Sequence, residues 1–160
     1  GALQGLDKRE TVAQHGEQQV LEWRRGFSVR PPAMAFDDPE RPANHPRYRD
    51  LANIPDTESL ADTLTRVTRW WHEALVPLLT QKKRVLVVAH GNSLRALVKY
   101  IDNMSEEDIL HFNIPTGIPL IYELDDQLSP RGREYLADSE KLSSAIDEIK
   151  NQVTQDKHGN

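Results

Sequence analysis

Cysteine is absent from the 160 residues of this chain, which excludes disulfides, thiolate metal sites and cysteine nucleophiles. This absence fits a reducing compartment, and we expect a cytoplasmic protein. Long apolar runs are also missing, because no stretch approaches the ~20 residues that a membrane span needs. Residues 1–6 lack the basic and apolar regions of a signal peptide. We therefore expect no membrane partner.

Positive charge is not in excess. The chain has 20 Lys and Arg residues against 25 Asp and Glu residues, and the net charge is -5. Such a balance creates no broad field that attracts nucleic acid or acidic lipid, so we expect no nucleic-acid partner. An anionic ligand would have to be attracted by a local cluster of cationic side chains.

Two common kinds of catalytic site find little support in the sequence. The six histidines form neither an i, i+4 pair nor a carboxylate-flanked group, so no metal is expected. Ser93 is not framed by glycines on both sides, as the nucleophile of a nucleophile elbow is. Histidine chemistry without a metal remains open.

The apolar periodicity predicts an α/β fold. Helices are predicted by apolar residues at steps of three and four, often with capping residues; they cover 7–25 with a break at Gly16, 57–81, 92–101, 105–112 and 138–155. Strands are predicted at the apolar runs Val85–Ala89 and Ile118–Leu124. Because Val85–Ala89 is apolar on both faces, it is typical of the middle of a parallel sheet covered by helices. We expect residues 1–160 to form one α/β domain, with an open, mostly parallel sheet flanked by helices.

Two strands are too few for such a sheet. Either strands in a proline-rich region have escaped detection, or part of the sheet is supplied from outside these residues. We favour the second alternative, so that the domain is partial.

Residues 28–56 show neither helical nor strand periodicity. They hold six of the ten prolines and four arginines: Pro31, Pro32, Pro39, Pro42, Pro46, Pro55, Arg30, Arg41, Arg47 and Arg49. A long irregular segment in a compact domain is either functional or a disordered connector. Because of its arginines, we favour an ordered loop that covers the substrate.

His90 is the strongest candidate for chemistry. It follows the run Val85–Ala89, and Gly91 and Asn92 lead directly into a predicted helix. Ligands of α/β sheets bind beyond the carboxyl ends of strands, and the N–H groups of a new helix attract anions. An imidazole there can donate, accept or carry a proton near neutral pH. The alternative is a buried structural histidine followed by a plain helix cap at Asn92 or Ser93.

Arg24 and Arg25 end the first helical region, and Lys8 lies near its beginning. Paired arginines can bind a phosphate or carboxylate through two parallel hydrogen bonds. Alternatively, they only compensate the helix dipole and stay solvated.

Four blocks in this order resemble the cofactor-dependent phosphoglycerate mutases of the histidine phosphatase superfamily: Gly1–Lys8, Trp23–Arg25, Ala89–Tyr100 and Asn113–Gly117. The resemblance extends from Gly1 to about Tyr135. It implies a cytoplasmic isomerase of glycolysis and gluconeogenesis that interconverts 2-phosphoglycerate and 3-phosphoglycerate. It further implies a phosphohistidine intermediate, priming by 2,3-bisphosphoglycerate, no metal and a homodimer.

The resemblance also assigns roles to residues. His90 matches the second active-site histidine, which stabilises the phosphoryl group during transfer, and Gly91 and Asn92 match the hydrogen-bond donors beside it. Lys8, Arg24 and Arg25 match the cations that hold the phosphate and carboxylate of the substrate. Phosphoryl transfer depends mostly on positioning and charge neutralisation, which such a set of residues supplies.

The chain departs from the family pattern in one respect. The nucleophilic histidine of the family lies in an Arg-His-Gly motif, and no such tripeptide occurs here. The family's proton-donating glutamate would fall just before Gly1. We therefore expect the carboxyl-terminal part of a mutase, inactive alone, with Val85–Ala89 as an exposed apolar edge. The alternatives are a non-catalytic anion-binding interaction module and a broad-specificity histidine phosphatase.

Overall fold

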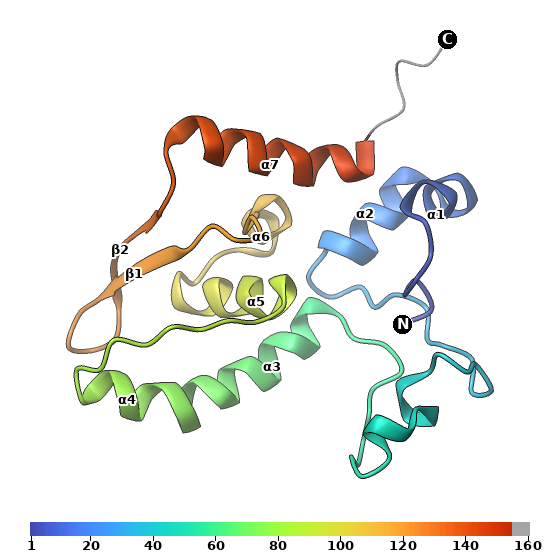
Figure 1. Cartoon of the computed structure of the whole chain (residues 1–160), viewed down its shortest axis with the longest axis horizontal. Helices are drawn as coiled ribbons and strands as arrows, with labels where there is room; N and C mark the ends of the chain where they lie inside the picture. Colours follow the sequence, from blue (N-terminus) through green and yellow to red (C-terminus); the bar gives the residue numbers. More distant parts are fainter. Residues whose placement is uncertain (155–160) are drawn as a thin grey trace.

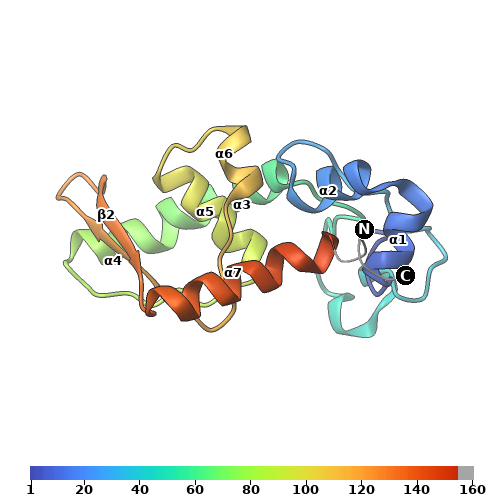
Figure 2. The ribbon, with the colours of Figure 1, turned by 90° about the horizontal axis from the view of Figure 1, so that it is seen from above.

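The computed structural model describes residues 1–154, with side chains through Ile149. Helices dominate, and the two ends of the molecule differ in character (Figures 1 and 2). Helices α1 (Lys8–His15) and α2 (Glu17–Arg25) lie at one end, and a hairpin of β1 (Leu120–Leu124) and β2 (Pro130–Tyr135) lies at the other. Helix α7 (Ser139–Thr154) runs from the hairpin back to α1 and α2, which it contacts.

The amino-terminal helices are separated where the sequence predicts. Gly16 lies between α1 and α2 with a φ of 82°, a conformation that glycine adopts without steric cost. Asp7 caps α1, since its carboxylate accepts hydrogen bonds from the N–H groups of Arg9 and Glu10. The predicted break at Gly16 is confirmed.

The longest helical segment consists of α3 (Leu60–Trp70), a π-helical turn (Trp71–Leu75) and α4 (Val76–Thr80). Ser59 and Asp62 form a complete capping box at its start. Pro77 has no N–H to donate to the preceding turn, which accounts for the irregular turn before α4. The helix predicted over 57–81 is thus present, with its middle distorted.

Helices α5 (Gly91–Ile101) and α6 (Glu106–His111) complete the core. Helix α5 packs along α3, and Ser105 with Asp108 forms a second capping box at the start of α6. The central cluster is apolar and buried; it consists of Leu60, Val67, Trp71, Leu75, Ala96, Leu97 and Ile109. The predicted helical faces of α3 and α5 therefore meet each other.

The sheet differs from the prediction. It has two antiparallel strands, with Leu120 opposite Tyr135 and an irregularity between Glu123 and Leu124. Pro130 begins β2, and the turn precedes it at Asp125, whose carboxylate accepts from two following N–H groups. The fold is mixed α/β, and the predicted open parallel sheet is not found.

Val85–Ala89 is not a strand of any sheet within the described residues. Only Val87 of this run packs against the core cluster, while Leu86 and Val88 are 82% and 85% exposed. A strand needs the backbone groups of a neighbour, and no described segment lies in register with this run. The predicted strand is therefore not found among the described residues, whereas the predicted exposure of this apolar run is observed.

Residues 28–56 contain no strand in the structure. They hold two 3₁₀ turns, Pro42–Asn44 and Pro46–Tyr48, joined by irregular backbone. Two ion pairs hold the segment in place. Arg30 pairs with Asp62 of α3 at 2.6 Å, and Arg41 pairs with Asp56 within the segment at 2.6 Å. Undetected strands in this region therefore do not explain the small sheet.

The carboxyl-terminal helix α7 begins after Asp138, whose carboxylate accepts from the N–H of Lys141. Gln155, the last residue of the predicted helix 138–155, lies outside the described residues. Among residues 1–154 no helix has the length and apolar character needed to cross a membrane.

Candidate functional site

His90 is the residue immediately before α5, and it caps that helix. Its backbone is extended, and Nδ1 accepts a hydrogen bond from the N–H of Asn92 at 3.2 Å. A ring nitrogen that accepts carries no proton, so the neutral ring holds its proton on Nε2. Because His90 is exposed rather than buried, the alternative of a core histidine does not describe it. Nε2–H is available to an incoming oxygen.

The first turn of α5 leaves donors open. Helix α5 begins at Gly91, one residue earlier than predicted, and the N–H groups of Asn92 and Leu94 bond to His90. Within the described part of the chain, those of Gly91 and Ser93 have no acceptor. A Cβ added at Gly91 would meet no atom within 4 Å. An anion can therefore approach this backbone closely.

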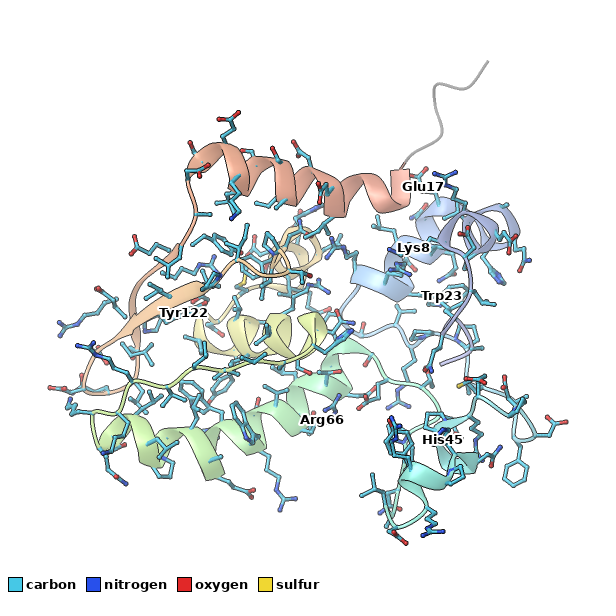
Figure 3. All side chains as sticks on the ribbon, viewed as in Figure 1. Lys8, Glu17, Trp23, His45, Arg66 and Tyr122 are labelled. Carbon is cyan, nitrogen blue, oxygen red and sulfur yellow. The ribbon has the colours of Figure 1, made fainter. Side chains whose placement is uncertain are left out.

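A cavity of about 460 Å³ opens beside His90 and Asn92. Besides the start of α5, its walls come from four parts of the chain: the amino-terminal turn, α2 through Trp23, the segment 31–58, and α3 through Thr63 and Arg66. Trp23 and Arg66 are labelled in Figure 3. The segment 31–58 thus contributes part of the wall around the imidazole.

Two carboxylates of the cavity wall are already neutralised by arginines. Arg41 donates two hydrogen bonds to Asp56, at 2.6 and 3.0 Å, and Arg66 donates two to Glu58, at 2.8 and 3.0 Å. This pairing reduces the repulsion that the carboxylates would exert on an anion in the cavity.

Lys8, Arg24 and Arg25 form a cationic cluster. Burial, followed by the positive charges of Arg24 and Arg25, lowers the pKa of Lys8. The pKa of Arg25 is likewise lowered by burial and by the charge of Arg24. Besides burial, the charges of Arg24 and Arg25 thus act on Lys8, and that of Arg24 acts on Arg25, and a bound anion would relieve this repulsion. None of the three lies among the residues that line the cavity beside His90, as the described residues form it.

Arg95 connects the start of α5 beside His90 to the cationic cluster through the end of α2. Its Nη1 donates to Asn92 Oδ1 at 3.3 Å, and its Nη2 donates to the backbone oxygen of Arg25 at 3.1 Å. The Arg95 side chain thereby joins Asn92 to the end of α2, and the backbone N–H of Asn92 bonds in turn to His90 Nδ1. No role is predicted for Arg95 from the sequence, although its position one helical turn after Asn92 is an available signal.

Asn113 is a second residue that the sequence analysis gave no role. It is buried, and its Oδ1 accepts a hydrogen bond from Arg25 Nη2. Its own amide donates to the backbone oxygen of His111 at 3.1 Å, and Tyr135 Oη donates to its backbone oxygen at 2.6 Å. Arg25 is thus held at both its backbone and its guanidinium, which differs from a freely solvated helix end.

No group of three or more His, Asp or Glu side chains suited to a metal ion occurs in the described part of the chain. The donors assembled here are cations and N–H groups, which favour an anionic ligand.

Residues 32–129 match the family model of the histidine phosphatase superfamily (branch 1). The matched region is more than half of the chain and includes His90, Gly91, Asn92 and Arg95, whereas Lys8 and the α2 arginines precede it. Members of this superfamily carry out phosphatase or mutase-type chemistry. The chain therefore belongs to branch 1 of the histidine phosphatase superfamily.

Proposed function

We propose that this chain forms the substrate-binding part of a 2,3-bisphosphoglycerate-dependent phosphoglycerate mutase, which interconverts 2-phosphoglycerate and 3-phosphoglycerate in glycolysis and gluconeogenesis. One observation carries the proposal: the hydrogen-bonded connection from His90 through Asn92 and Arg95 to Arg25. It joins an exposed imidazole and the free N–H groups of a helix start to a cluster of cations. A phosphorylated carboxylic acid needs hydrogen-bond donors for its phosphate and positive charge for its phosphate and carboxylate.

Each predicted residue has a defined task in this proposal. His90 donates from Nε2 to an oxygen of the phosphoryl group during transfer, while the Gly91 N–H and the Asn92 side chain hold other oxygens. Lys8, Arg24 and Arg25 neutralise the remaining phosphate and carboxylate charge. Donors that are fixed before the reaction stabilise the charge of the transition state without reorganisation.

The phosphoryl-accepting histidine belongs, in this proposal, to a segment outside these 160 residues. The chain contains no Arg-His-Gly sequence, and the apolar run Val85–Ala89 beside His90 has backbone groups without a partner among residues 1–154. The cationic cluster and the open N–H groups of α5 fit the phosphates and carboxylate of 2,3-bisphosphoglycerate. When bound, that cofactor would supply the phosphoryl group that charges the nucleophile. A cytoplasmic homodimer is part of the same proposal.

A broad-specificity phosphatase is the second candidate, and one observation favours it. Arg30 and Arg41, two of the four arginines in residues 28–56, pair with Asp62 and Asp56. A less cationic cover would retain a bisphosphate intermediate less well and admit water more readily. A mutase and a phosphatase would use the same anion-binding residues. They differ in whether the phosphoglycerate or water takes the phosphoryl group from the phosphohistidine.

The test measures phosphoglycerate mutase and phosphatase rates of the full-length protein, with and without 2,3-bisphosphoglycerate. We expect isomerisation to exceed hydrolysis and to require priming. His90→Gln should lower kcat by about 10²- to 10⁴-fold. The matched control is His72→Gln. His72 lies in the π-helical turn Trp71–Leu75 and bonds Tyr100 Oη of α5 at 2.8 Å, so this variant should leave both rates unchanged. Predominant hydrolysis would support the phosphatase instead.

A further inference from the structure

The guanidinium of Arg95 is the most completely enclosed cationic group of the site. Arg95 is 4% exposed, and all three of its nitrogens donate. Besides Asn92 Oδ1 and the backbone oxygen of Arg25, it reaches the backbone oxygens of Ile109 at 2.5 Å and Phe112 at 3.2 Å. The Arg95 side chain thus connects its own helix α5 to the last residue of α2, to α6 and to the residue after α6.

The charge of Arg95 has no carboxylate partner in the described part of the chain. Buried arginines usually pair with an acid, because an uncompensated charge is costly to remove from water. Here every acceptor is a neutral oxygen, and burial, with a contribution from Arg25, lowers the pKa of Arg95 to about 10. The side chain is still charged at neutral pH, so its field adds to that of Arg25. A nearby bound anion would relieve this electrostatic cost.

We propose that Arg95 is a positioning residue of the anion site. It fixes Asn92 relative to the end of α2 that carries Arg25, so that two ligand-binding groups from different elements keep one geometry. This inference rests on the proposed function, because it assumes that Asn92 and Arg25 bind the substrate. Arg95 itself does not need to touch the ligand.

The shape of the guanidinium explains why this position requires arginine. Nη1 points to Asn92, Nη2 to Arg25 and Ile109, and Nε to Phe112. A lysine keeps the charge, but its three N–H donors radiate from one nitrogen, which cannot reach acceptors that are spread around the three spaced nitrogens of a guanidinium. Arg95→Lys therefore separates the effect of geometry from the effect of charge. Small displacements of binding groups are enough to cost large factors in affinity or rate.

The experiment measures 3-phosphoglycerate affinity by isothermal titration calorimetry on the full chain, at a temperature where circular dichroism shows each variant folded. Arg95→Lys should raise Kd by about tenfold or more. Arg133→Lys is the matched control: Arg133 pairs with Asp102 at 2.7 Å and stacks on the Phe112 ring, so it is also an anchored guanidinium. The control should lower thermal stability and change Kd by less than about twofold.

The outcomes separate the two proposals. A wild-type chain that does not bind 3-phosphoglycerate contradicts the proposed function. A wild type that binds, together with an Arg95→Lys variant of equal affinity, overturns only the positioning role of Arg95. Equal weakening by Arg95→Lys and Arg133→Lys overturns it as well, since general loosening would then explain both.

A measurement on the unmutated chain covers the case in which Arg95→Lys does not fold. The Nε–H resonance of Arg95 is followed by ¹H–¹⁵N spectroscopy while 3-phosphoglycerate is added. We expect it to shift together with the side-chain amide of Asn92, because the two groups share a hydrogen-bonded connection. An Arg95 resonance that stays fixed while Asn92 and Arg25 shift would overturn the inference.

Discussion

Arg25 and Asn92 are held by the same side chain: the guanidinium of Arg95 donates to the backbone oxygen of Arg25 at 3.1 Å and to Asn92 Oδ1 at 3.3 Å. The arginine pair of α2 and the helix start after His90 are therefore one structural unit, although they are far apart in the sequence. The site depends on this tertiary connection as much as on the residues that would bind the ligand.

Gly91→Ala tests whether the open space at the start of α5 is used by a ligand. The added methyl meets no neighbour, so the free energy of unfolding should stay the same or rise by up to about 1 kcal/mol. Affinity for 3-phosphoglycerate should fall, because the methyl occupies the approach to the N–H groups. Gly132→Ala in β2, where the space is equally open, is the control and should bind normally. Wild-type affinity in Gly91→Ala would mean that no ligand approaches there.

Arg25→Lys tests the anchoring of the cationic cluster. The lysine cannot reproduce the bond to the buried Asn113 Oδ1, so the variant should lose about 1–3 kcal/mol of unfolding free energy as well as affinity. Urea denaturation and calorimetric titration measure the two effects. Arg69→Lys affects an exposed pair with Glu73 and should change stability by less than about 0.5 kcal/mol. Similar losses in both variants would show that Arg25 has no special anchor.

Asp62→Asn gives a pH-dependent prediction. Hydrogen bonds from Arg30, then from Ser59, hold the pKa of Asp62 well below its usual value of 3.8. The contribution of the ionised Asp62 carboxylate to the free energy of unfolding is therefore complete above the unfolded pKa of 3.8. It is lost as the pH falls from there toward the lower pKa of the folded state. The stability difference between wild type and variant should be constant near neutral pH and should shrink below about pH 4.

Urea midpoints measured from pH 7 down to acid conditions check this prediction. Asp37→Asn, at an exposed position, is the control, and its offset from wild type should not depend on pH in the same way. A gap between Asp62→Asn and wild type that widens as the pH falls would contradict the assigned hydrogen bonds.

The exposed run Val85–Ala89 predicts self-association of the chain when it is isolated. Leu86 and Val88 present apolar side chains to solvent, and the backbone groups beside them have no partner in the described part of the chain, which favours pairing with another chain. Replacing both with lysine should reduce the association seen by sedimentation velocity and leave the unfolding free energy unchanged. If the wild type is monomeric at high concentration and unfolds cooperatively, this edge is not an association surface.

The helices could be predicted because their signals are local. Ser59 with Asp62 and Ser105 with Asp108 mark the starts of α3 and α6, and both capping boxes are present. The break at Gly16 needs only the conformational freedom of one residue. Each of these features depends on residues within one or two turns of each other, which sequence reasoning can compare directly.

The sheet and the connection within the site could not be predicted in the same way. Whether Val85–Ala89 becomes a strand depends on a neighbour, and apolar character alone does not supply one. Arg95 looks like an ordinary surface cation in a helix, because its acceptors come from α2, α6 and the residue after α6.

The most direct test of the phosphoglycerate site is a ¹H–¹⁵N titration of the chain with 3-phosphoglycerate. We predict saturable shifts at the backbone N–H of Gly91 and Asn92 and at the side chains of Arg24 and Arg25. A second cavity of about 540 Å³, lined in part by His45 and Arg47, offers an internal comparison. Saturable shifts confined to that cavity, or no saturable shifts at all, would contradict the account.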